Sequence, residues 1–272
     1  MVFNQGSSLI SYFCHDLQVE IILLQEHWLT PDNMYKISKC HTNYSCVGIS
    51  AMEQAVSRSI IKGRPYGGSC ILYKTSLTKR ILFQTCSERM SAIVYDNLLI
   101  INVYCNKIIT DSDRCNVLLL FAEVQEVISM FPNLNIIWGG DFNIDLSKPS
   151  VDQEMFNHFI HNFDLVSCSS IIDSNLTYTY CHQSLDHKSF IDYFLISEPS
   201  ILVDFKVLDL ANNLSDHCPI FIQIKKPRSG SASIQMHAPS ESNNSTILKF
   251  RWDYANLQYY SDCCRELTAT TI

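Results

Sequence analysis

The sequence lacks an excess of basic residues: 20 Lys and Arg stand against 27 Asp and Glu, which gives a formal net charge of −7. Proteins that hold nucleic acid through their own charge usually carry a basic patch, and this composition does not indicate one. An acidic chain can still act on a polyanion when bound cations reverse the local field. The charge balance therefore leaves a metal-dependent enzyme open.

Long apolar runs are also missing. No run approaches the ~20 residues that a membrane helix needs. The first residues, 1–9, lack the basic segment and the long apolar segment of a signal peptide. We therefore expect a protein without a membrane partner that is not secreted and resides in the nucleus or cytoplasm.

The twelve cysteines show no C-x-x-C spacing of the kind that binds zinc. With 272 residues the chain is also too long to need a disulfide framework in place of a core. We expect free, mostly buried thiols and a reducing compartment.

Apolar residues make up 47% of the chain, enough for a sizeable core. Helical spacing predicts helices over 111–131 and 151–163, and a short helix over 9–17. A polar turn at Asp96-Asn97 splits one long apolar segment into a hairpin. Many strands and few helices in mixed order predict an α+β layered domain. Strands are expected at 19–24, 69–74, 80–85, 91–104, 134–138, 176–180, 190–197, 203–210 and 219–224.

The composition changes near residue 225. Residues 225–249 are rich in Ser, Pro, Gly and Asn and are typical of a linker. Residues 250–272 place apolar and aromatic side chains at helical spacing, and a helix this short cannot bury such a face alone. We expect one domain over 1–224, a linker over 225–249, and a C-terminal helical segment that docks or leads to a further domain.

Polar residues lie at the ends of the predicted strands: some follow a strand, Asp192 lies within FIDYFLIS, and Asp216 and His217 precede PIFIQI. Because strand ends meet at one edge of a sheet, such residues are candidates for a common site. Carboxylates, amides and one histidine, without clustered cysteines, suit Mg²⁺ or Mn²⁺ and an oxyanion substrate. The candidates are Glu26, Tyr104, Asn106, Asp141, Asn143, Asp192, Asp216 and His217.

Each candidate has a structural alternative. Asp141 and Asn143 could form an Asx turn after their strand. The same segment begins like a calcium loop, but Leu146 stands where Gly is needed and Asp152 where Glu is needed. Taken singly, Glu26 fits a surface acid and Tyr104 a core tyrosine.

Asp192 lies inside an apolar strand, and a buried carboxylate needs a partner. Asp216 and His217 are sequence neighbours and poorly placed to bond each other, so Asp192 is the better partner for His217. The stretch GRPYGG resembles a turn into a strand, with Arg64 a candidate phosphate contact.

Five stretches in order, LLQEHWL, INVY, WGGDFNID, FIDYFLIS and LSDHCPIFI, resemble the endonuclease/exonuclease/phosphatase superfamily over roughly residues 8–224. The sequences QEHWL, GRPYGG and GGDFN are similar to those of the apurinic-type endonuclease domain of LINE-type non-LTR retrotransposons. The resemblance implies a four-layer α/β/β/α sandwich of the DNase I-like kind, with its site at one edge. It implies DNA as partner, Mg²⁺ as cofactor (Mn²⁺ as a substitute), and a reverse transcriptase domain downstream. We expect the chain to be a monomer.

The resemblance also implies roles for individual residues. Glu26 matches a metal-binding glutamate, and Asp216 an acid at or near the metal. Asp141 matches the aspartate that deprotonates the attacking water, and Asn143 the asparagine that holds the phosphate.

Three further positions match. Asp192 and His217 correspond to the pair whose histidine stabilises the developing negative charge. Tyr104 corresponds to a tyrosine that contacts the phosphate or leaving group. Thr179 corresponds to a DNA-contacting threonine, so Tyr104, Asn143 and Thr179 are the expected DNA contacts.

Two departures from the family pattern concern the start of the chain and Tyr104. The family opens with a strand that ends in a metal-binding Asn and a Gly; this chain opens with MVFNQG, so we expect that strand to be missing, cut off before residue 1. Cys105 and Asn106 follow Tyr104, where the family usually has a proline. The main hypothesis is a metal-dependent endonuclease that nicks one DNA strand; the alternatives are an inactive retrotransposon-derived fragment and a phosphoesterase of small substrates.

Overall fold

Two layers of β-sheet form the centre of the fold, and the candidate residues lie at or near the ends of their strands. The computed structural model describes residues 3–225 apart from 59–63, 183, 185–186 and 212. The predicted linker and C-terminal segment lie outside these residues, except for Lys225. The larger sheet has strand order β4-β5-β6-β7-β11-β8. Its strands are β4 (Ile81–Cys86), β5 (Met90–Tyr95), β6 (Leu98–Tyr104), β7 (Asn135–Asp141), β8 (Val166–Ser167) and β11 (Asp192–Ile196).

The other layer contains a three-stranded sheet of order β1-β3-β2 and a two-stranded sheet of β12 and β13. A small hairpin, β9 with β10, stands apart from both layers in the connection between β8 and β11. The strands are β1 (Ile21–Gln25), β2 (Tyr44–Ile49), β3 (Ser69–Lys74), β9 (Tyr180–His182), β10 (His187–Ser189), β12 (Leu202–Val207) and β13 (Ile220–Ile224).

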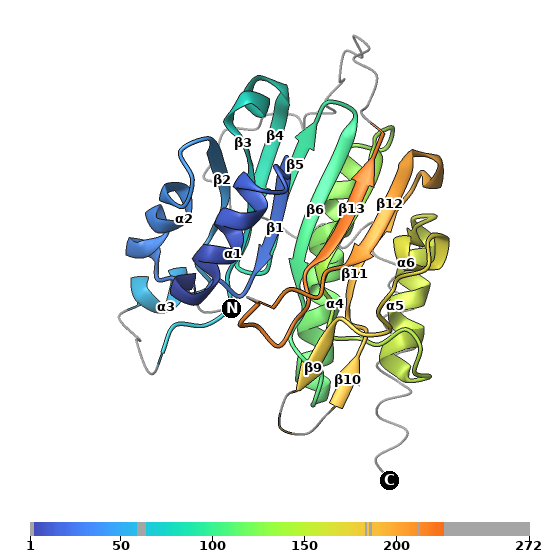
Figure 1. Ribbon diagram of the computed structural model, residues 1–272. Coiled ribbons are helices and arrows are strands. Elements are labelled where there is room, and N and C mark those ends of the chain that lie inside the picture. The colour runs from blue at the N-terminus through green and yellow to red at the C-terminus, as the bar shows by residue number, and fades with distance from the viewer. Residues whose placement is uncertain (1–2, 59–63, 183, 185–186, 212, 226–272) are drawn as a thin grey trace, which may run out of the picture. The chain divides into compact units, whose positions relative to one another are not determined.

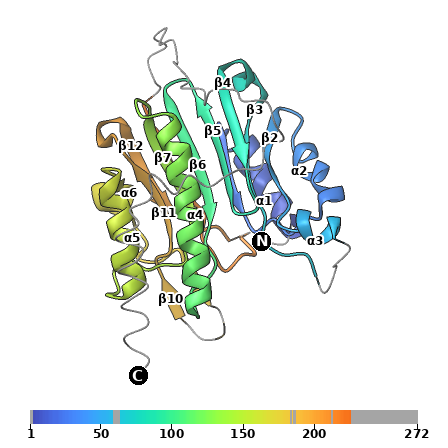
Figure 2. The same cartoon turned by 180° about the vertical axis from the view of Figure 1, so that it is seen from behind.

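Helices cover the outer faces of the sheets. Figure 2 shows α4 and α5 lying over the six-stranded sheet, and Figure 1 shows α1 in front of the three-stranded one. Short 3₁₀ turns, Pro31–Asn33, Thr75–Arg80 and Pro199–Ile201, complete the connections. The helices are α1 (Phe3–His15), α2 (Tyr35–Lys39), α3 (Glu53–Ser57), α4 (Asp111–Met130), α5 (Val151–Asn162) and α6 (Cys168–Ile171).

Three apolar clusters separate four layers. One cluster lies between α4, α5 and the six-stranded sheet and contains Phe121, Trp138 and Phe156. A second lies between the two sheet layers and contains Ile71, Ile93 and Ile137 among its members. A third lies between α1, α2 and the three-stranded sheet. The predicted mixed α+β fold, with central sheets flanked by helices, is confirmed.

Local sequence explains the element boundaries. Thr110 caps α4: its hydroxyl accepts from the Asp113 N–H and the Asp113 carboxylate accepts from the Thr110 N–H, so two free donors at the helix start are satisfied. Asp96 adopts φ 51° in the tight turn between β5 and β6, as the hairpin prediction required. β5 is buried along its length and β6 up to Tyr104, because both faces of their sheet are covered.

Some expected boundaries are wrong. The first helix begins at Phe3 rather than at residue 9 and ends at His15. Strands β2, β8 and β10 were not predicted. The expected strand over 176–180 is irregular up to Thr179. The hydroxyl of Thr179 accepts hydrogen bonds from the N–H groups of Ile191 and Asp192. None of the helices in the described part of the chain is both long and apolar enough to cross a bilayer.

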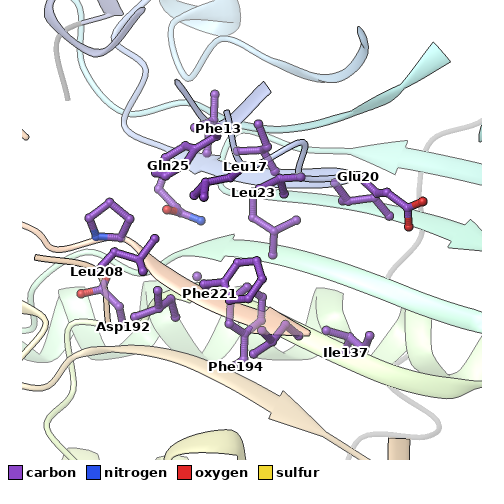
Figure 3. Close-up of a pocket in the computed structure, with 18 of the residues that line it drawn as sticks. Phe13, Leu17, Glu20, Leu23, Gln25, Ile137, Asp192, Phe194, Leu208 and Phe221 are labelled. Carbon is purple, nitrogen blue, oxygen red and sulfur yellow. The ribbon is translucent and has the colours of Figure 1, made fainter. Parts of the chain in front are cut away.

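A cavity of about 650 Å³ lies between the layers. It runs along β1 and β13, beneath α1 and above the six-stranded sheet, and one end reaches the candidate site (Figure 3). The ten cysteines in the described residues are free thiols, as expected; four are buried, five are partly buried and one is exposed.

Candidate active site

Asp141 and Asp192 face each other across two neighbouring strands. Asp141 ends β7, Asp192 begins β11, and the antiparallel register places the two residues directly opposite each other. Both are buried, with 4% and 8% of their surface exposed. Burial, and then the negative charge of Asp192, hold the pKa of Asp141 well above its usual range.

The glycines before Asp141 serve a close approach between strands. Gly139 and Gly140 both lie inside β7. Gly140 has φ +145°, and a Cβ added to it would lie 2.0 Å from the carbonyl oxygen of Val103 on β6. Only glycine fits this position, so the sequence GG sets how closely β7 packs against β6 just before Asp141.

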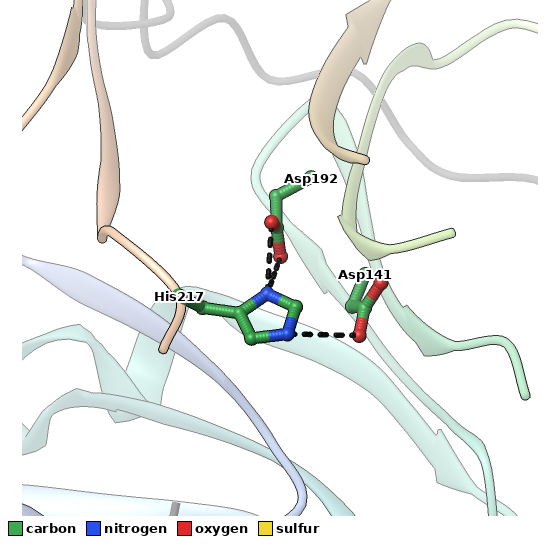
Figure 4. A group of neighbouring side chains, drawn as sticks. All are labelled: Asp141, Asp192 and His217. Carbon is green, nitrogen blue, oxygen red and sulfur yellow. Dashed lines mark hydrogen bonds and ion pairs between the residues drawn. The ribbon is translucent and has the colours of Figure 1, made fainter. Parts of the chain in front are cut away.

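His217 lies against both carboxylates (Figure 4). Its Nδ1 donates to Asp192, at 3.1 Å from Oδ1 and 3.0 Å from Oδ2, and its Nε2 lies 3.9 Å from Asp141 Oδ2. The predicted pairing of Asp192 with His217 is therefore present. Burial alone would lower the pKa of His217, but the charge and hydrogen bond of Asp192, together with Asp141, raise it to about 9. The imidazole is protonated at neutral pH.

Thr179 holds this pair together. Its hydroxyl accepts from the backbone N–H groups of Ile191, at 3.0 Å, and Asp192, at 3.1 Å, and its carbonyl accepts from the Cys218 N–H at 2.6 Å. One residue thus joins the start of β11 to the segment that carries His217. Thr179 has 0% of its surface exposed, and this position does not fit the DNA contact expected from the sequence.

Asn143 is fixed beside Asp141. Its N–H donates to Asp141 Oδ1 at 2.9 Å, and its side-chain Nδ2 donates to the Cys105 carbonyl at 2.8 Å. The first bond is the Asx turn considered as an alternative, so turn and site coexist here. Asn143 has φ 52°, a left-handed conformation that asparagine tolerates.

Glu26 and Tyr104 complete the same edge. Glu26 directly follows β1 and has φ 51°, while Tyr104 stands beside Asp141 in the parallel register of β6 and β7. The Tyr104 hydroxyl is hydrogen-bonded to Glu26, and burial followed by this carboxylate raises the pKa of the phenol. Tyr104 therefore stays neutral and keeps a proton to donate.

A buried polar network positions the end of β1, and the sequence analysis missed it. Asn102 has 0% of its surface exposed, and its Nδ2 donates to the Leu24 carbonyl and to Ser69 Oγ, each at 3.0 Å. Gln25 Nε2 donates to Asn102 Oδ1. The polar residue within the apolar run LLIINV was the available signal, since a buried amide must find partners.

His27 was also missed. It is buried, donates from Nε2 to the Ile49 carbonyl at 3.1 Å and accepts at Nδ1 from the Leu29 N–H at 3.1 Å. Burial lowers its pKa to about 4, so it is a neutral structural link next to Glu26. Its ring packs on Gly68, where a Cβ would lie 2.3 Å from the imidazole.

Asp216, Asn106 and Arg64 are the remaining candidates. Asp216 is exposed, and its negative charge is one of the smaller causes that raise the pKa of His217. Asn106 is half-buried one residue after Cys105. Arg64 is exposed and lies over the ring of Trp28, 4.6 Å from its centroid.

The acidic residues fit a divalent cation. Ligand atoms of Asp141, Asp192 and His217 lie within 4.8 Å of one another, and the Glu26 carboxylate acts on Asp141 electrostatically. A protonated His217 offers no lone pair, so the carboxylates are the better ligands of this group. A hard cation would relieve the repulsion between buried carboxylates that raises the pKa of Asp141.

Comparison with known proteins agrees with this geometry. The endonuclease/exonuclease/phosphatase family model matches residues 3–217. None of the curated proteins compared with the chain matches it. Among solved structures, the 3′ phosphatase NExo from Neisseria, bound to a product DNA hairpin, has a TM-score of 0.64 at 18% identity, covering 83% of this chain and 96% of that one.

Two other structures share the fold. An AP endonuclease from Archaeoglobus fulgidus has a TM-score of 0.63 at 15% identity, covering 83% of this chain and 96% of that one. A mannosyl-6-phosphatase from Bacteroides thetaiotaomicron has a TM-score of 0.57 at 17% identity, covering 82% and 92%. Because the family model spans most of the described residues, the chain belongs to the endonuclease/exonuclease/phosphatase family.

Proposed function

We propose that the chain is a metal-dependent phosphodiesterase that nicks one strand of DNA and leaves 3′-hydroxyl and 5′-phosphate ends. The observation that carries the proposal is the contact of His217 with two buried carboxylates, Asp192 at 3.0 Å and Asp141 at 3.9 Å, beside Glu26. Hydrolysis of a phosphodiester needs a base for water and donors for the phosphate oxygens, and this edge supplies both.

Asp141 is the group that takes a proton from water. Asp141 is buried at the end of β7, and its Oδ1 is held by the Asn143 N–H, which fixes the carboxylate as the base of the site. The Asn143 side-chain Nδ2 donates to the Cys105 carbonyl at 2.8 Å and to Asp141 Oδ2 at 3.2 Å, and a non-bridging phosphate oxygen would replace Asp141 as the second acceptor. Asp141 and Asn143 are hydrogen-bonded to each other, so the water held by one and the phosphate held by the other would be positioned together.

His217 and Tyr104 are the proposed hydrogen-bond donors to the phosphate. His217 keeps its proton because Asp192 accepts from Nδ1, which leaves Nε2–H free to stabilise negative charge on the phosphate. Tyr104 is neutral, and its single O–H would turn from Glu26 to become a second donor toward the phosphate or leaving group. Asp192 and Thr179 are positioning residues, since they act through His217 and the start of β11.

Glu26 would hold Mg²⁺ or Mn²⁺ together with the Asp141 carboxylate, and Asp216 is the further predicted ligand. The cation, when bound, neutralises charge on the phosphate and lets an acidic protein meet a polyanion. Because the net charge of the chain is −7, binding of any DNA substrate would need such a cation.

DNA is the substrate favoured by the motif sequences and by two similar structures, NExo and the AP endonuclease. The stretches QEHWL, GRPYGG and GGDFN are similar to retrotransposon endonucleases, and the similar NExo structure holds a product DNA hairpin. We assign the chain to the LINE-type endonucleases, acting as a monomer on chromosomal DNA in the nucleus, with a reverse transcriptase as partner. Tyr104 and Asn143 are the proposed DNA contacts.

Nicking of supercoiled plasmid tests the proposal. We expect open-circle DNA with Mg²⁺ or Mn²⁺, none with EDTA, and a nick that DNA ligase reseals because it carries 3′-hydroxyl and 5′-phosphate ends. Asp141→Ala and His217→Ala should each slow nicking about 10²–10⁴-fold. Asp145→Ala is the matched control, because Asp145 lies in the same loop but pairs with Lys148.

The outcomes separate the alternatives. Nicking that survives in Asp141→Ala would reject the site. Hydrolysis of a small phosphomonoester without nicking would favour the small-substrate phosphoesterase. A folded protein that binds Mg²⁺ but cleaves neither substrate would favour the inactive fragment.

A further inference from the structure

The residues on either side of Glu26 are held by hydrogen bonds, and Glu26 itself has an unusual backbone conformation. Glu26 has φ 51° and Trp28 has φ 54°, both in the left-handed region that residues other than glycine seldom adopt. A glutamate in this region persists where the surrounding structure holds it. The turn that carries Glu26 into the site therefore depends on its neighbours.

Gln25 fixes the turn from the side of β1. Its Nε2 donates to Asn102 Oδ1, although the two residues are 77 positions apart in the sequence. The acceptor is rigid: Asn102 is fully buried, and its Nδ2 donates to the Leu24 carbonyl and to Ser69 Oγ, each at 3.0 Å. The side chain of Gln25 is therefore held in one position.

The strand that holds Gln25 also holds Glu26. Asn102 and Tyr104 lie two positions apart on β6, so their side chains point to the same face of the sheet. Asn102 accepts from Gln25, and the Tyr104 hydroxyl is hydrogen-bonded to Glu26. Two alternate residues of β6 thus fix two successive residues, the last of β1 and the one that follows it.

His27 and Trp28 fix the turn from the other side. His27 has 3% of its surface exposed, and its ring links the Ile49 carbonyl to the Leu29 N–H, each at 3.1 Å. The Trp28 N–H donates to the Gly67 carbonyl at 3.0 Å. The turn is therefore anchored at both of its ends.

We propose that Gln25 and His27 are positioning residues that set how tightly Glu26 binds a divalent cation. The inference rests on the proposed function, in which Glu26 holds Mg²⁺ or Mn²⁺ together with Asp141. A carboxylate that is fixed before the cation arrives loses less freedom on binding it. Partners of this kind, which hold a ligand without touching the metal, typically contribute about 10–100-fold to metal affinity.

A purely structural role for these hydrogen bonds would have a different signature. Loss of a buried hydrogen bond lowers the free energy of unfolding wherever the bond lies in the network. Loss of metal affinity is expected where the bond holds the turn at Glu26. Ser91 separates the two effects: its Oγ lies 3.3 Å from Asn102 Nδ2 and 3.0 Å from Ser69 Oγ, and these bonds do not reach residues 25–28.

Titration with Mn²⁺, followed by the EPR signal of the free ion, tests the proposal on the full chain without substrate. Gln25→Met keeps nearly the length of glutamine and removes the amide, and we expect the Kd for Mn²⁺ to rise about 10–100-fold. His27→Phe keeps a ring on Gly68 and removes both hydrogen bonds of the imidazole, so its Kd should rise by a similar factor. Glu26→Gln, which removes the proposed ligand itself, shows the largest effect to be expected.

Ser91→Ala is the matched control. It should unfold at lower urea concentration than the wild type and bind Mn²⁺ with the wild-type Kd. For Gln25→Met, the rate of nicking at saturating Mn²⁺ should stay within about threefold of the wild type, because the reacting groups remain and the occupancy of the cation is restored. Circular dichroism checks that the variants fold, and either Gln25→Met or His27→Phe suffices for the test.

Three outcomes would overturn the proposal. A wild-type Kd in Gln25→Met and His27→Phe, with weak binding by Glu26→Gln, would reject it and leave the proposed function standing. An equal rise of the Kd in Ser91→Ala would show that any damage to the buried network weakens the site. A wild-type protein that neither binds Mn²⁺ nor nicks DNA would reject the proposed function and this inference with it.

Discussion

Asp192 lies directly opposite Asp141 in the register of β11 and β7, and it alone of the two accepts a hydrogen bond from His217. The two carboxylates therefore have different environments although they are close neighbours. Asp192 is hydrogen-bonded to the imidazolium, while Asp141 lies 3.9 Å from Nε2 and keeps a raised pKa. This difference favours Asp141 as the base and His217 as the charge-stabilising acid.

Asp192→Asn should reduce kcat for nicking by about 10²–10⁴-fold with little change in KM, because the amide cannot hold His217 in its charged form. The same variant should lower the pKa of His217, measured by NMR titration. A kcat loss with an unchanged His217 pKa would contradict the positioning role, and circular dichroism would confirm that the variant folds.

Stability should fall at alkaline pH because of His217. Its pKa is raised from 6.5 to about 9, so its contribution is complete below pH 6.5 and is lost as pH rises through about 9. The difference corresponds to about 3 kcal/mol at most. Urea unfolding at pH 6 and pH 10 should show a larger loss in the wild type than in His217→Gln, and equal losses would contradict this.

Asp141→Asn should stabilise the protein without divalent cations by about 1–3 kcal/mol, because it removes a buried carboxylate that faces Asp192 and keeps an acceptor for the Asn143 N–H. Mg²⁺ should raise the Tm of the wild type and not that of the variant. A variant less stable than the wild type in EDTA would show that the carboxylate is not repelled in this site.

Thr179→Val should destabilise the protein by about 1–3 kcal/mol for each backbone N–H that loses its acceptor, those of Ile191 and Asp192. The matched variant Thr179→Ser keeps the hydroxyl and should keep most of the stability, measured by urea unfolding. If Thr179 instead contacts DNA, Thr179→Val would weaken DNA binding while leaving the unfolding free energy unchanged.

Gly140→Ala should destabilise by several kcal/mol, since the added Cβ would lie 2.0 Å from the Val103 carbonyl oxygen at φ +145°. Gly139→Ala is a graded comparison, because its Cβ would meet ring and methyl atoms of Phe194 and Leu23 that can move. Thermal unfolding of both variants tests the difference, and equal effects would contradict the backbone argument.

The sequence predicted most of the strands and the two long helices because their apolar periodicity is strong, whereas the short or polar strands β2, β8 and β10 carry little of it. It also predicted that Asp192 pairs with His217, since a carboxylate within FIDYFLIS needs a partner once buried. It could not predict that Thr179 is buried: its bonds go to Ile191 and Asp192, and nothing in the YTY stretch specifies which chain lies above it.

The network around Asn102 escaped prediction for a similar reason. A single amide in an apolar strand is visible in the sequence, but its partners, Gln25, Leu24 and Ser69, are 33 or more residues away. The role of His27 is equally non-local, because its ring packs on Gly68 and bonds to Ile49. Local patterns specify elements, whereas these contacts depend on how the layers come together.

Asn102 has a consequence for the alignment of the two layers. The side-chain amide of Asn102 bonds to strands of the three-stranded sheet, while its backbone belongs to β6. These hydrogen bonds can form in one relative placement of the two layers. A displacement by one residue would strand several buried donors and acceptors at once. The placement of Glu26, after β1, relative to Asp141, at the end of β7, therefore depends on Asn102, a residue that is fully buried between the two layers.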